Sequence, residues 1–362
     1  MNSLAAPHDA SSPTLSADDP RVTVGEDVTP AEWDAYVEGH PQATGCHSWV
    51  WRTVIERSFQ HPANYLVARD GSGTIRGVLP LVRFNSWLFG RFLVSLPFLN
   101  YGGILANHDA ARRALLEAAI ALARTHGCRH VELRHVARQL PDVPVKQHKV
   151  TMLMPLEATT EAAWKRLDNK VRNQVRKAEK SGLVGTVGGV DLLADFYPIF
   201  ARNMRDLGTP VYARRFFEEI LGAFPDRARV FVVRKDGTPV AAGIGCTWRD
   251  TIEVPWASSL REYRQMCPNM MLYWTAIKHG VDAGLRTLDF GRSTPGGGTY
   301  QFKKQWGAEP VPLHWEYWLP ETSSIPDQGP ANPRMQTAIR LWQRLPLAVA
   351  NVVGPHVVRA IP

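Results

Sequence analysis

The pattern of apolar and polar positions repeats within the chain, at a spacing of about 160 residues. Residues 65–71 are a short apolar run that ends in Asp-Gly, and residues 231–237 repeat that run. A second apolar run follows each turn, over 77–82 and 240–246. Two β-rich runs joined by an Asp-Gly turn are typical of a β-hairpin, so we predict one hairpin in each half.

Each half also contains a helical pattern that ends at a glycine and leads into a strand. The glycines are Gly127 and Gly284, and the strand patterns that follow them cover 128–133 and 285–290. A glycine directly after the last helical turn is a common helix terminator. The two repeats together predict two copies of one α/β unit. We expect a functional site at their junction, where pockets often form.

Composition and pattern divide the 362 residues into four segments. Residues 1–22 are rich in Ser, Ala, Pro and Asp, which predicts a disordered leader. Residues 23–150 and 151–320 each hold one copy of the unit and are long enough for a core of their own. Residues 321–362 begin with a linker rich in Pro, Ser and Gly and continue as a basic amphipathic helix. The expected fold class is α/β, with two mixed sheets flanked by helices.

The composition is that of a soluble globular protein, with 44% hydrophobic and 21% charged residues. The four cysteines lie far apart without a C-x-x-C pair, which argues against a disulfide framework or zinc site and for a reducing compartment. We find neither a signal-peptide pattern nor an uncharged apolar run long enough to span a membrane. No helical H-x-x-x-H pair occurs, so we expect no metal. The expected location is the cytoplasm.

Basic residues are concentrated in two places. The net charge is +8, which favours anionic partners. Between 165 and 180, seven cations face two acids, and apolar residues recur every three or four positions, which predicts one amphipathic helix. Its outer face is either simply solvated or an anion-binding surface that carries Lys170, Arg172, Arg176 and Lys177.

The second basic region is the C-terminus. No acid follows Asp327, and Met335, Ala338, Ile339 and Trp342 fall on one helical face before Pro346. A short basic amphipathic helix can lie on an anionic membrane surface. It can also pack back on the protein, and this is the interpretation that we favour.

A glycine-rich segment, residues 291–299, links a strand pattern to a short helix that contains two lysines. Phe302 and Trp306 are four residues apart and should anchor the helix in the core. Lys303 and its neighbours then face the backbone amides of the loop, which can hold an anion. The sequence lacks the P-loop pattern G-x-x-x-x-G-K-[ST]. From this segment we take four candidate substrate-site residues: Arg292, Tyr300, Lys303 and Lys304.

Residues 170–178 (KVRNQVRKA) and 300–307 (YQFKKQWG) resemble the FemAB family of peptidoglycan-bridge aminoacyltransferases. More narrowly, the chain is similar to the FemAB-like proteins linked to exopolysaccharide and PEP-CTERM (exosortase) gene clusters. The resemblance runs from about Trp33 to Trp318, and the stretch RLWQRLP near the C-terminus is similar to the tail of that subgroup.

The resemblance implies two tandem GNAT-like domains and transfer of an acyl group to an amine, without a tightly bound cofactor. FemAB enzymes use an aminoacyl-tRNA donor and a peptide acceptor on a cell-wall precursor. Their motif lysine, which lies near the acceptor phosphates and the reacting carbonyl, falls on Lys303. A preorganised cationic donor of this kind is worth about 3 kcal/mol to a tetrahedral oxyanion.

Two departures leave the acyl donor open. The long coiled-coil arm of several FemAB enzymes is absent, which weakens the case for tRNA. The R/Q-x-x-G-x-G/A loop that holds coenzyme A in ordinary GNAT enzymes is also absent, since the corresponding residues 264–269 read RQMCPN. The donor is therefore an aminoacyl-tRNA or an acyl-CoA.

Three further residues are candidates for the site. Glu253 and Asp289 lie on predicted strands and can act as general base toward an amine, or can pair with a nearby arginine. Tyr101 follows an apolar strand and is a candidate for the cleft.

We expect a cytoplasmic N-acyltransferase that acts on an amine of a phosphorylated or lipid-linked cell-envelope or exopolysaccharide precursor. An acyl-CoA-dependent N-acetyltransferase is one alternative. A non-catalytic module that binds tRNA or an anionic membrane is the other. The inner face of the cytoplasmic membrane is a candidate peripheral contact.

Overall fold

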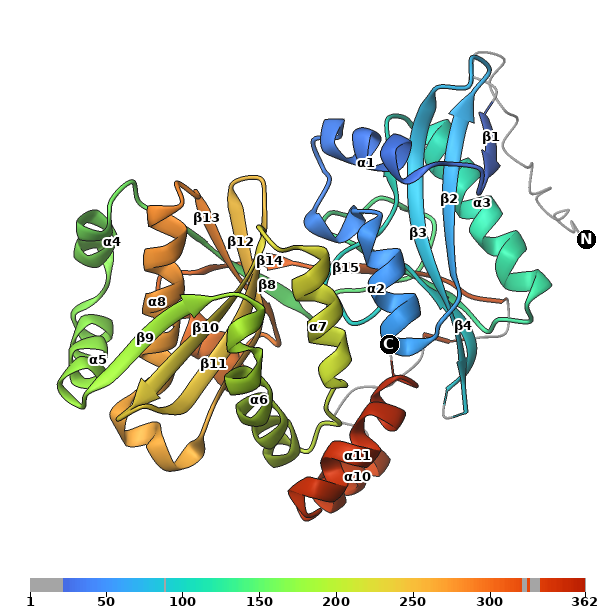
Figure 1. Ribbon diagram of the computed structural model, residues 1–362. Helices are drawn as coiled ribbons and strands as arrows, with labels where there is room; N and C mark the ends of the chain where they lie inside the picture. Colours follow the sequence, from blue (N-terminus) through green and yellow to red (C-terminus); the bar gives the residue numbers. More distant parts are fainter. Residues whose placement is uncertain (1–21, 88, 321–323, 326–332, 362) are drawn as a thin grey trace, which may run out of the picture.

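The computed structural model describes residues 22–87, 89–320, 324–325 and 333–361. It contains two mixed β-sheets that lie side by side, with helices on their faces (Figure 1). The predicted leader, residues 1–22, lies outside the described residues except for Val22, which begins the first strand. Most of the predicted linker lies outside them as well.

The strands of the first sheet, in spatial order, are β1 (Val22–Gly25), β2 (Ala63–Asp70), β3 (Ile75–Ser86), β4 (Gly90–Val94), β6 (Val131–His135), β15 (His314–Trp318) and β7 (Val145–Lys146), with β5 (Leu105–Ala106) paired to β3. Those of the second are β9 (Leu183–Gly188), β10 (Ala228–Lys235), β11 (Thr238–Trp248), β12 (Thr251–Ser259), β13 (Thr287–Ser293), β8 (Val150–Pro155) and β14 (Glu309–Pro312).

The described α-helices are α1 (Pro30–Gly39), α2 (Val50–Phe59), α3 (Asp109–Thr125), α4 (Thr160–Arg166), α5 (Asn169–Lys180), α6 (Leu193–Leu207), α7 (Arg214–Ala223), α8 (Pro268–Asp282), α9 (Gly298–Lys304), α10 (Pro333–Gln343) and α11 (Leu347–Val358). Short 3₁₀ turns cover Gly45–His47, Val190–Leu192 and Arg261–Met266.

The two sheets follow the same plan, which confirms the predicted fold class. In each, an antiparallel hairpin (β2–β3 or β10–β11) is followed by a parallel pair (β4–β6 or β12–β13). The helices that connect the parallel strands, α3 and α8, end just before Gly127 and Gly284. Both glycines have positive φ, 59° and 70°, a conformation that favours glycine. The repeated sequence pattern therefore marks two copies of one structural unit.

A two-stranded ribbon connects the sheets. One strand of it is formed by β7, residues 147–149 and β8; the other is formed by β14, Leu313 and β15. The amide of Leu313 donates to the carbonyl of Lys149 (3.0 Å) where the ribbon passes between the sheets. In the first sheet β15 is the inner strand of the ribbon, and in the second sheet β8 is the inner one. The first sheet therefore takes one strand, β15, from the second half of the chain, whereas the strands of the second sheet all lie within residues 150–312.

This ribbon corrects one sequence prediction. The alternating apolar residues of 311–319 predict a single strand that closes the second unit, within 151–320. Instead the chain leaves the second sheet after Pro312 and enters the first at His314, where β15 pairs with β6. Apolar alternation identifies a strand here, but it does not specify which sheet the strand joins.

The hydrophobic core continues across the two halves. Alternate residues of β10 face opposite sides: Val230 and Val232 pack with α6 and α7, whereas Phe231 and Val233 pack with α5 and α8. The first of these clusters also includes Trp33 and other buried residues of the first half, and α7 packs against α2. On the other side of the first sheet, α3 covers a separate cluster.

The C-terminal helices pack back on the protein, as favoured by the sequence interpretation. Both α10 and α11 contact α6. His61 Nε2 donates to the carbonyl of Arg359 (2.6 Å), and Ser86 Oγ donates to the carbonyl of Ala360 (2.8 Å). The tail therefore joins the second half, at α6, to the first half, at β3.

The predicted basic helix over 165–180 is wrong as a single element. It is divided into α4, which ends at Arg166, and α5, which begins at Asn169. Between them Leu167 and Asp168 are extended, with ψ near 141° and 149°, and Leu167 is buried. The extended conformation of these two residues ends the first helix while keeping the leucine side chain in the core. The apolar stripe of α5, formed by Val171, Val175 and Ala178, is buried as predicted.

Glu316, the middle residue of β15, allows the contribution of the ribbon to stability to be tested. Its side chain is fully buried and accepts hydrogen bonds from the amides of Gln139 (3.0 Å) and Leu140 (2.7 Å) and from His135 Nδ1 (2.6 Å), whose Nε2 accepts the amide hydrogen of Ile104. Burial raises the pKa of Glu316, but these contacts outweigh burial and lower it overall.

We predict that Glu316→Ala lowers the free energy of unfolding by about 3–5 kcal/mol, because it leaves buried partners without a charge to meet. Glu309→Ala, on the exposed edge of the same ribbon, should change it by less than about 0.5 kcal/mol. Urea unfolding measures both. Because the folded-state pKa of Glu316 is lowered, the difference should shrink as the pH falls below about 4.5. Equal effects of the two substitutions would contradict the role of the ribbon.

Candidate active site at the junction of the two sheets

The candidate site begins where the parallel strands β12 and β13 cease to pair. Their hydrogen-bonded register covers Thr251–Glu253 against Thr287–Asp289 and then stops, although both strands continue. On the other side, the pairing of β13 with β8 shifts between Asp289 and Arg292. Gly291, in this irregular stretch, has φ of 73°. The interruption leaves backbone and side chains at the strand ends free to line a site.

Two cavities open at this interruption. The first, here called the apolar cavity, has a volume of about 290 Å³ and is lined by both halves of the chain, including Cys46, Trp51, Tyr101, Trp248, Glu253 and Asp289. The second, here called the polar cavity, has a volume of about 240 Å³ and is lined by Asn100, Asn203, Tyr212, Arg292 and Lys303, among others. Leu99, Pro255 and Trp256 line both. The two cavities are therefore neighbours that share a wall formed by these three residues.

Asp289 is fixed by three hydrogen bonds. Tyr101 Oη donates to one carboxylate oxygen (2.6 Å), whereas Thr151 Oγ1 (2.5 Å) and the amide of Gly291 (2.7 Å) donate to the other. Burial raises the pKa of Asp289 despite these donors, and it raises that of Tyr101 well above 10. With its oxygens occupied, Asp289 is suited to holding the strand ends in position rather than to accepting a proton from substrate.

Glu253 is the better placed base. Asn100 Nδ2 donates to its Oε1 (2.7 Å), and the side chain is only half-buried at the wall of the apolar cavity. Burial and the negative charge of Asp289 raise the pKa of Glu253 to about 8, against the opposing effects of Asn100 and Lys303. A carboxylate that takes up a proton near neutral pH, beside a cavity, is suited to general base catalysis.

Lys303 supplies a buried cation next to this pair. Its side chain is 7% exposed, and Nζ donates to the carbonyls of Gly291 (2.9 Å) and Arg292 (3.0 Å). Burial lowers the pKa of Lys303 to about 8, although Asp289 and Glu253 favour its charged form. An ammonium has three donor hydrogens, so these two contacts leave one that can be directed at a substrate oxygen in the polar cavity.

A group of cations surrounds Trp315, on the ribbon beside the polar cavity. The guanidinium carbons of Arg134 and Arg292 lie 4.4 Å and 5.1 Å from the centre of its ring. Lys149 Nζ donates to Thr294 Oγ1 (2.6 Å), and the positive charge of Arg292 helps to lower the pKa of Lys149. The side chain of Arg292 is partly accessible to solvent. Desolvation by the surrounding protein and the positive charge of Arg134 lower its pKa to about 10. Arg134 is buried and already ion-paired with Glu132 (2.7 Å), so Lys149 and Arg292 are the members of this group that are placed to meet an anion.

The structure therefore brings together five of the predicted site residues: Tyr101, Glu253, Asp289, Arg292 and Lys303. It does not bring the others to the cavities. Lys304 is exposed on α9, and Tyr300 packs against the core of the second half. Lys170, Arg172, Arg176 and Lys177 lie on α5, which packs on α8 and β9 and lines neither cavity. The predicted binding roles of these residues remain predictions.

Sequence reasoning missed Asn100, Arg134, Lys149 and Thr151. The repeat itself contains a signal that points to the strand of Arg134. Glu132, two residues before Arg134, occupies the position in the first half that Asp289 occupies in the second. Like Asp289, Glu132 accepts a hydrogen bond from a tyrosine, Tyr317 Oη (2.8 Å). Among the described residues, no group of His, Cys, Asp or Glu is arranged to hold a metal ion, and no helix is long and apolar enough to cross a membrane.

Comparison with known proteins identifies the fold. Residues 165–304 match the family model for an acetyltransferase (GNAT) domain. No curated protein sequence matches the chain significantly.

Among solved structures, FemX matches with a TM-score of 0.61 and 16% identity, over 82% of this chain and 96% of that one. A tandem GNAT protein from the clavulanic acid biosynthesis pathway matches with a TM-score of 0.52 and 15% identity, over 84% and 100%. L-PGS from Bacillus licheniformis matches with a TM-score of 0.51 and 12% identity, over 89% and 99%. The second half of the chain thus contains a GNAT acetyltransferase domain, and the chain as a whole has the fold of two GNAT units in tandem.

Proposed function

We propose that the chain is an N-acyltransferase that moves an acyl or aminoacyl group onto an amine of a phosphorylated or lipid-linked cell-envelope precursor. The observation that carries this proposal is the placement of Glu253, a carboxyl group with a raised pKa at the wall of the apolar cavity, close to the buried Lys303 ammonium at the strand interruption. The match of residues 165–304 to an acetyltransferase domain supports the same class of reaction.

The reaction needs no nucleophilic side chain. The acceptor amine attacks the acyl carbonyl, a C–N bond forms, and Glu253 takes the proton that the nitrogen loses. Lys303 donates its remaining hydrogen to the oxyanion of the tetrahedral intermediate. When the intermediate collapses, the bond from the acyl carbon to the donor's sulfur or oxygen breaks, and the leaving group takes up a proton from Glu253 or solvent. Asp289 and Asn100 position the base and the strand ends through their hydrogen bonds.

The cations around Trp315 support an anionic substrate. Arg292 lines the polar cavity together with Lys303, and Lys149 lies close enough to Arg292 for the two charges to interact, so a phosphate bound there would bring the rest of the substrate to the strand interruption. We propose this group, rather than α5, as the main phosphate contact, because the α5 cations line neither cavity. The proposal of an exopolysaccharide precursor rests on the resemblance of residues 300–307 alone.

Two donors fit the proposal. The likeness to FemX shows the fold and leaves the donor open. At the start of α8, Pro268 lacks the amide hydrogen that a helix N-terminus would offer to a pyrophosphate, so an acyl-CoA would have to be held differently from the usual GNAT loop. Both donors are cytoplasmic molecules, and we place the reaction there.

The donor is decided by a transfer assay read by mass spectrometry. Purified protein is incubated with acetyl-CoA or with bulk aminoacyl-tRNA, and with glucosamine 6-phosphate or a UDP-linked muramyl peptide as amine acceptor. Product from one donor only identifies it. Displacement of labelled aminoacyl-tRNA by acetyl-CoA, followed across a salt series, separates specific binding from the salt-sensitive attraction that any basic protein shows for RNA.

We predict that Lys303→Met lowers kcat by about 100-fold to 1,000-fold, the loss expected when an oxyanion donor is removed. Lys304→Met is the matched control, because the adjacent lysine is exposed and outside both cavities, and it should leave kcat within about twofold. Circular dichroism and thermal unfolding of both variants show whether the fold is retained. Equal activity of the two folded variants would remove Lys303 from the mechanism.

We predict that kcat/KM rises with pH up to about 8, because Glu253 must lose its proton to act as a base. Glu253→Gln should lower kcat/KM by about 100-fold or more and remove this rise. A rise that persists in the variant belongs to the acceptor amine and would contradict the assignment.

Glu253 also offers a test that needs no substrate. The folded protein holds its proton up to about pH 8, whereas the unfolded chain releases it near pH 4.5. The free energy of unfolding of the wild type should therefore fall between pH 5 and 8, relative to Glu253→Gln. We expect a relative change of about 3–4 kcal/mol over this interval, since each tenfold change in proton affinity corresponds to about 1.4 kcal/mol. Parallel curves for the two proteins from urea unfolding would show that the pKa is not raised.

A further inference from the structure

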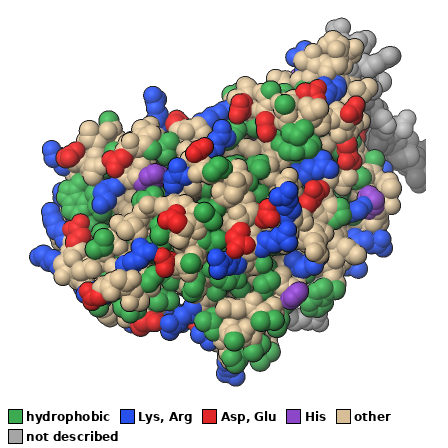
Figure 2. Space-filling view, in the orientation of Figure 1, with side chains coloured by type: hydrophobic (Ala, Val, Ile, Leu, Met, Phe, Trp, Pro, Cys, Tyr) green, Lys and Arg blue, Asp and Glu red, His purple; other side chains and the backbone are tan. Residues whose placement is uncertain are grey.

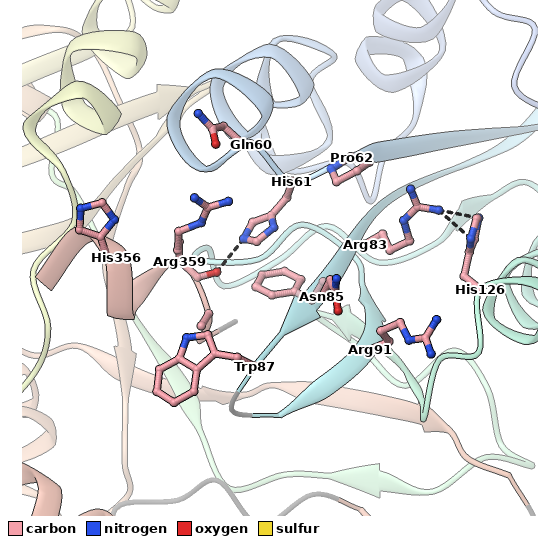
Figure 3. Close-up of a pocket in the computed structure, with 12 residues that line it drawn as sticks. Gln60, His61, Pro62, Arg83, Asn85, Trp87, Arg91, His126, His356 and Arg359 are labelled. Carbon is pink, nitrogen blue, oxygen red and sulfur yellow. Dashed lines mark hydrogen bonds between the residues drawn. The ribbon is translucent and has the colours of Figure 1, made fainter. Parts of the chain in front are cut away.

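A third cavity, of about 700 Å³, lies between the β3–β4 hairpin and the end of α11. None of its lining residues lines the apolar or the polar cavity. Three arginines (Arg83, Arg91 and Arg359) and three histidines (His61, His126 and His356) contribute to its wall (Figure 3). Among the described residues, no carboxylate does.

The absence of acids extends along both segments that build this cavity. From Gly71 to His108 the chain has no Asp or Glu, and none follows Asp327. Arg83 Nη1 donates to the ring of His126 (2.7 Å), and His61 is bonded to the carbonyl of Arg359. The guanidinium group of Arg91 is exposed. The cavity is thus a concentration of positive charge without internal neutralisation, which suits a phosphate group.

Exposed apolar side chains border the same cavity. Trp87, near the tip of the hairpin, is 76% exposed and lines the cavity wall. On α11, Val349, Val352 and Val353 are exposed, and their spacing of three and four residues places them on one face with His356, which reaches the cavity. The opposite face of α11, with Ala350, Gly354 and Val358, is buried.

This arrangement of apolar surface is unusual for a solvated helix. Figure 2 shows hydrophobic side chains gathered over the C-terminal helices at the lower edge of the molecule. The hairpin tip and α11 come from opposite ends of the chain, yet Ser86 Oγ bonds the carbonyl of Ala360 and holds them together. An exposed apolar patch beside a basic cavity is the surface expected of a protein that binds an anionic bilayer, where Trp and Val enter the headgroup region and Arg meets phosphate.

We propose that Trp87 and the exposed valine face of α11 insert into the surface of an anionic phospholipid membrane, with a lipid phosphate bound in the cavity of Arg83, Arg91 and Arg359. This interface is distinct from the candidate active site and does not depend on the proposed reaction. It differs from a simple charged tail, because half of it is contributed by the β3–β4 hairpin of the first unit.

The experiment measures binding of the full chain to vesicles by co-sedimentation. Vesicles of phosphatidylcholine with 30 mol% phosphatidylglycerol are compared, at physiological salt, with pure phosphatidylcholine. (The mole fraction is about that at which a leaflet acquires a substantial negative potential.) We expect binding to the anionic vesicles and at least tenfold weaker binding to the neutral ones. Failure of the intact protein to bind anionic vesicles would overturn the proposal.

Variants separate this surface from other sources of attraction. Val352→Glu should weaken binding about tenfold or more, because it places an acid at an anionic surface, whereas Val184→Glu, at an equally exposed valine of β9, should not. Arg83→Gln/Arg91→Gln should weaken binding about 20-fold, since each basic residue near an anionic leaflet contributes about fivefold. Lys177→Gln/Lys180→Gln removes the same charge from α5 and is the matched control.

Three outcomes would count against the proposal. Equal losses in the two double variants would show a general charge effect, and a loss confined to the α5 variant would move the contact to that helix. Undiminished vesicle binding together with loss of tRNA binding in Arg83→Gln/Arg91→Gln would identify the cavity as an RNA contact.

Competition by soluble glycerol phosphate distinguishes a lipid phosphate from a free phosphate ligand. Soluble glycerol phosphate should not displace the protein from vesicles if Trp87 and α11 hold the protein there. Trp87 fluorescence, which shifts to the blue on insertion, provides an independent readout with Trp87→Phe as the reference.

Discussion

The two-stranded ribbon between the sheets is the constraint on which the rest of the structure depends. The second sheet is built from strands within residues 150–312, whereas the first sheet is complete only when β15, from the second half of the chain, has crossed to pair with β6. The ribbon fixes the distance between the sheets, and Thr151 and Trp315 lie on its strands. The ribbon therefore carries both Thr151, which donates a hydrogen bond to Asp289, and Trp315, around which the cations gather.

The site combines charges that a protein interior normally avoids. Two acids, Glu253 and Asp289, and one lysine are desolvated together, and an arginine is nearby. Burial weakens the charged form of each group, so the pKa values of the acids rise and that of the lysine falls. The opposite shifts bring Glu253 and Lys303 to about 8, where both can exchange a proton near neutral pH. Glu253 and Asp289 influence each other's titration, so the proton uptake of these acids is a property of the cluster rather than of either residue.

The two copies of the repeat have diverged in how they use the same position. In the first, Glu132 is held by Arg134 Nε (2.7 Å) and Tyr317 Oη, and these contacts outweigh burial and lower its pKa. In the second, Asp289 has no arginine at this position, and Glu253 lies beside it on the neighbouring strand. The first acid is therefore a stabilised ion pair, and the second belongs to a strained cluster at an open cavity. This difference explains why the candidate chemistry is found in one copy only.

Sequence alone determined the repeated unit, its hairpins at the Asp-Gly turns and its helix ends at Gly127 and Gly284, because these depend on local turn chemistry and on glycine's access to positive φ. It also located Lys303, Glu253 and Asp289, since a glycine loop and strand-end acids are visible in the chain. Only the tertiary structure decided which sheet receives β15, because a strand's apolar alternation is the same in either sheet. It also decided that Arg134 and Lys149 join the site whereas the α5 cations do not, because side chains far apart in sequence meet only after the ribbon has crossed.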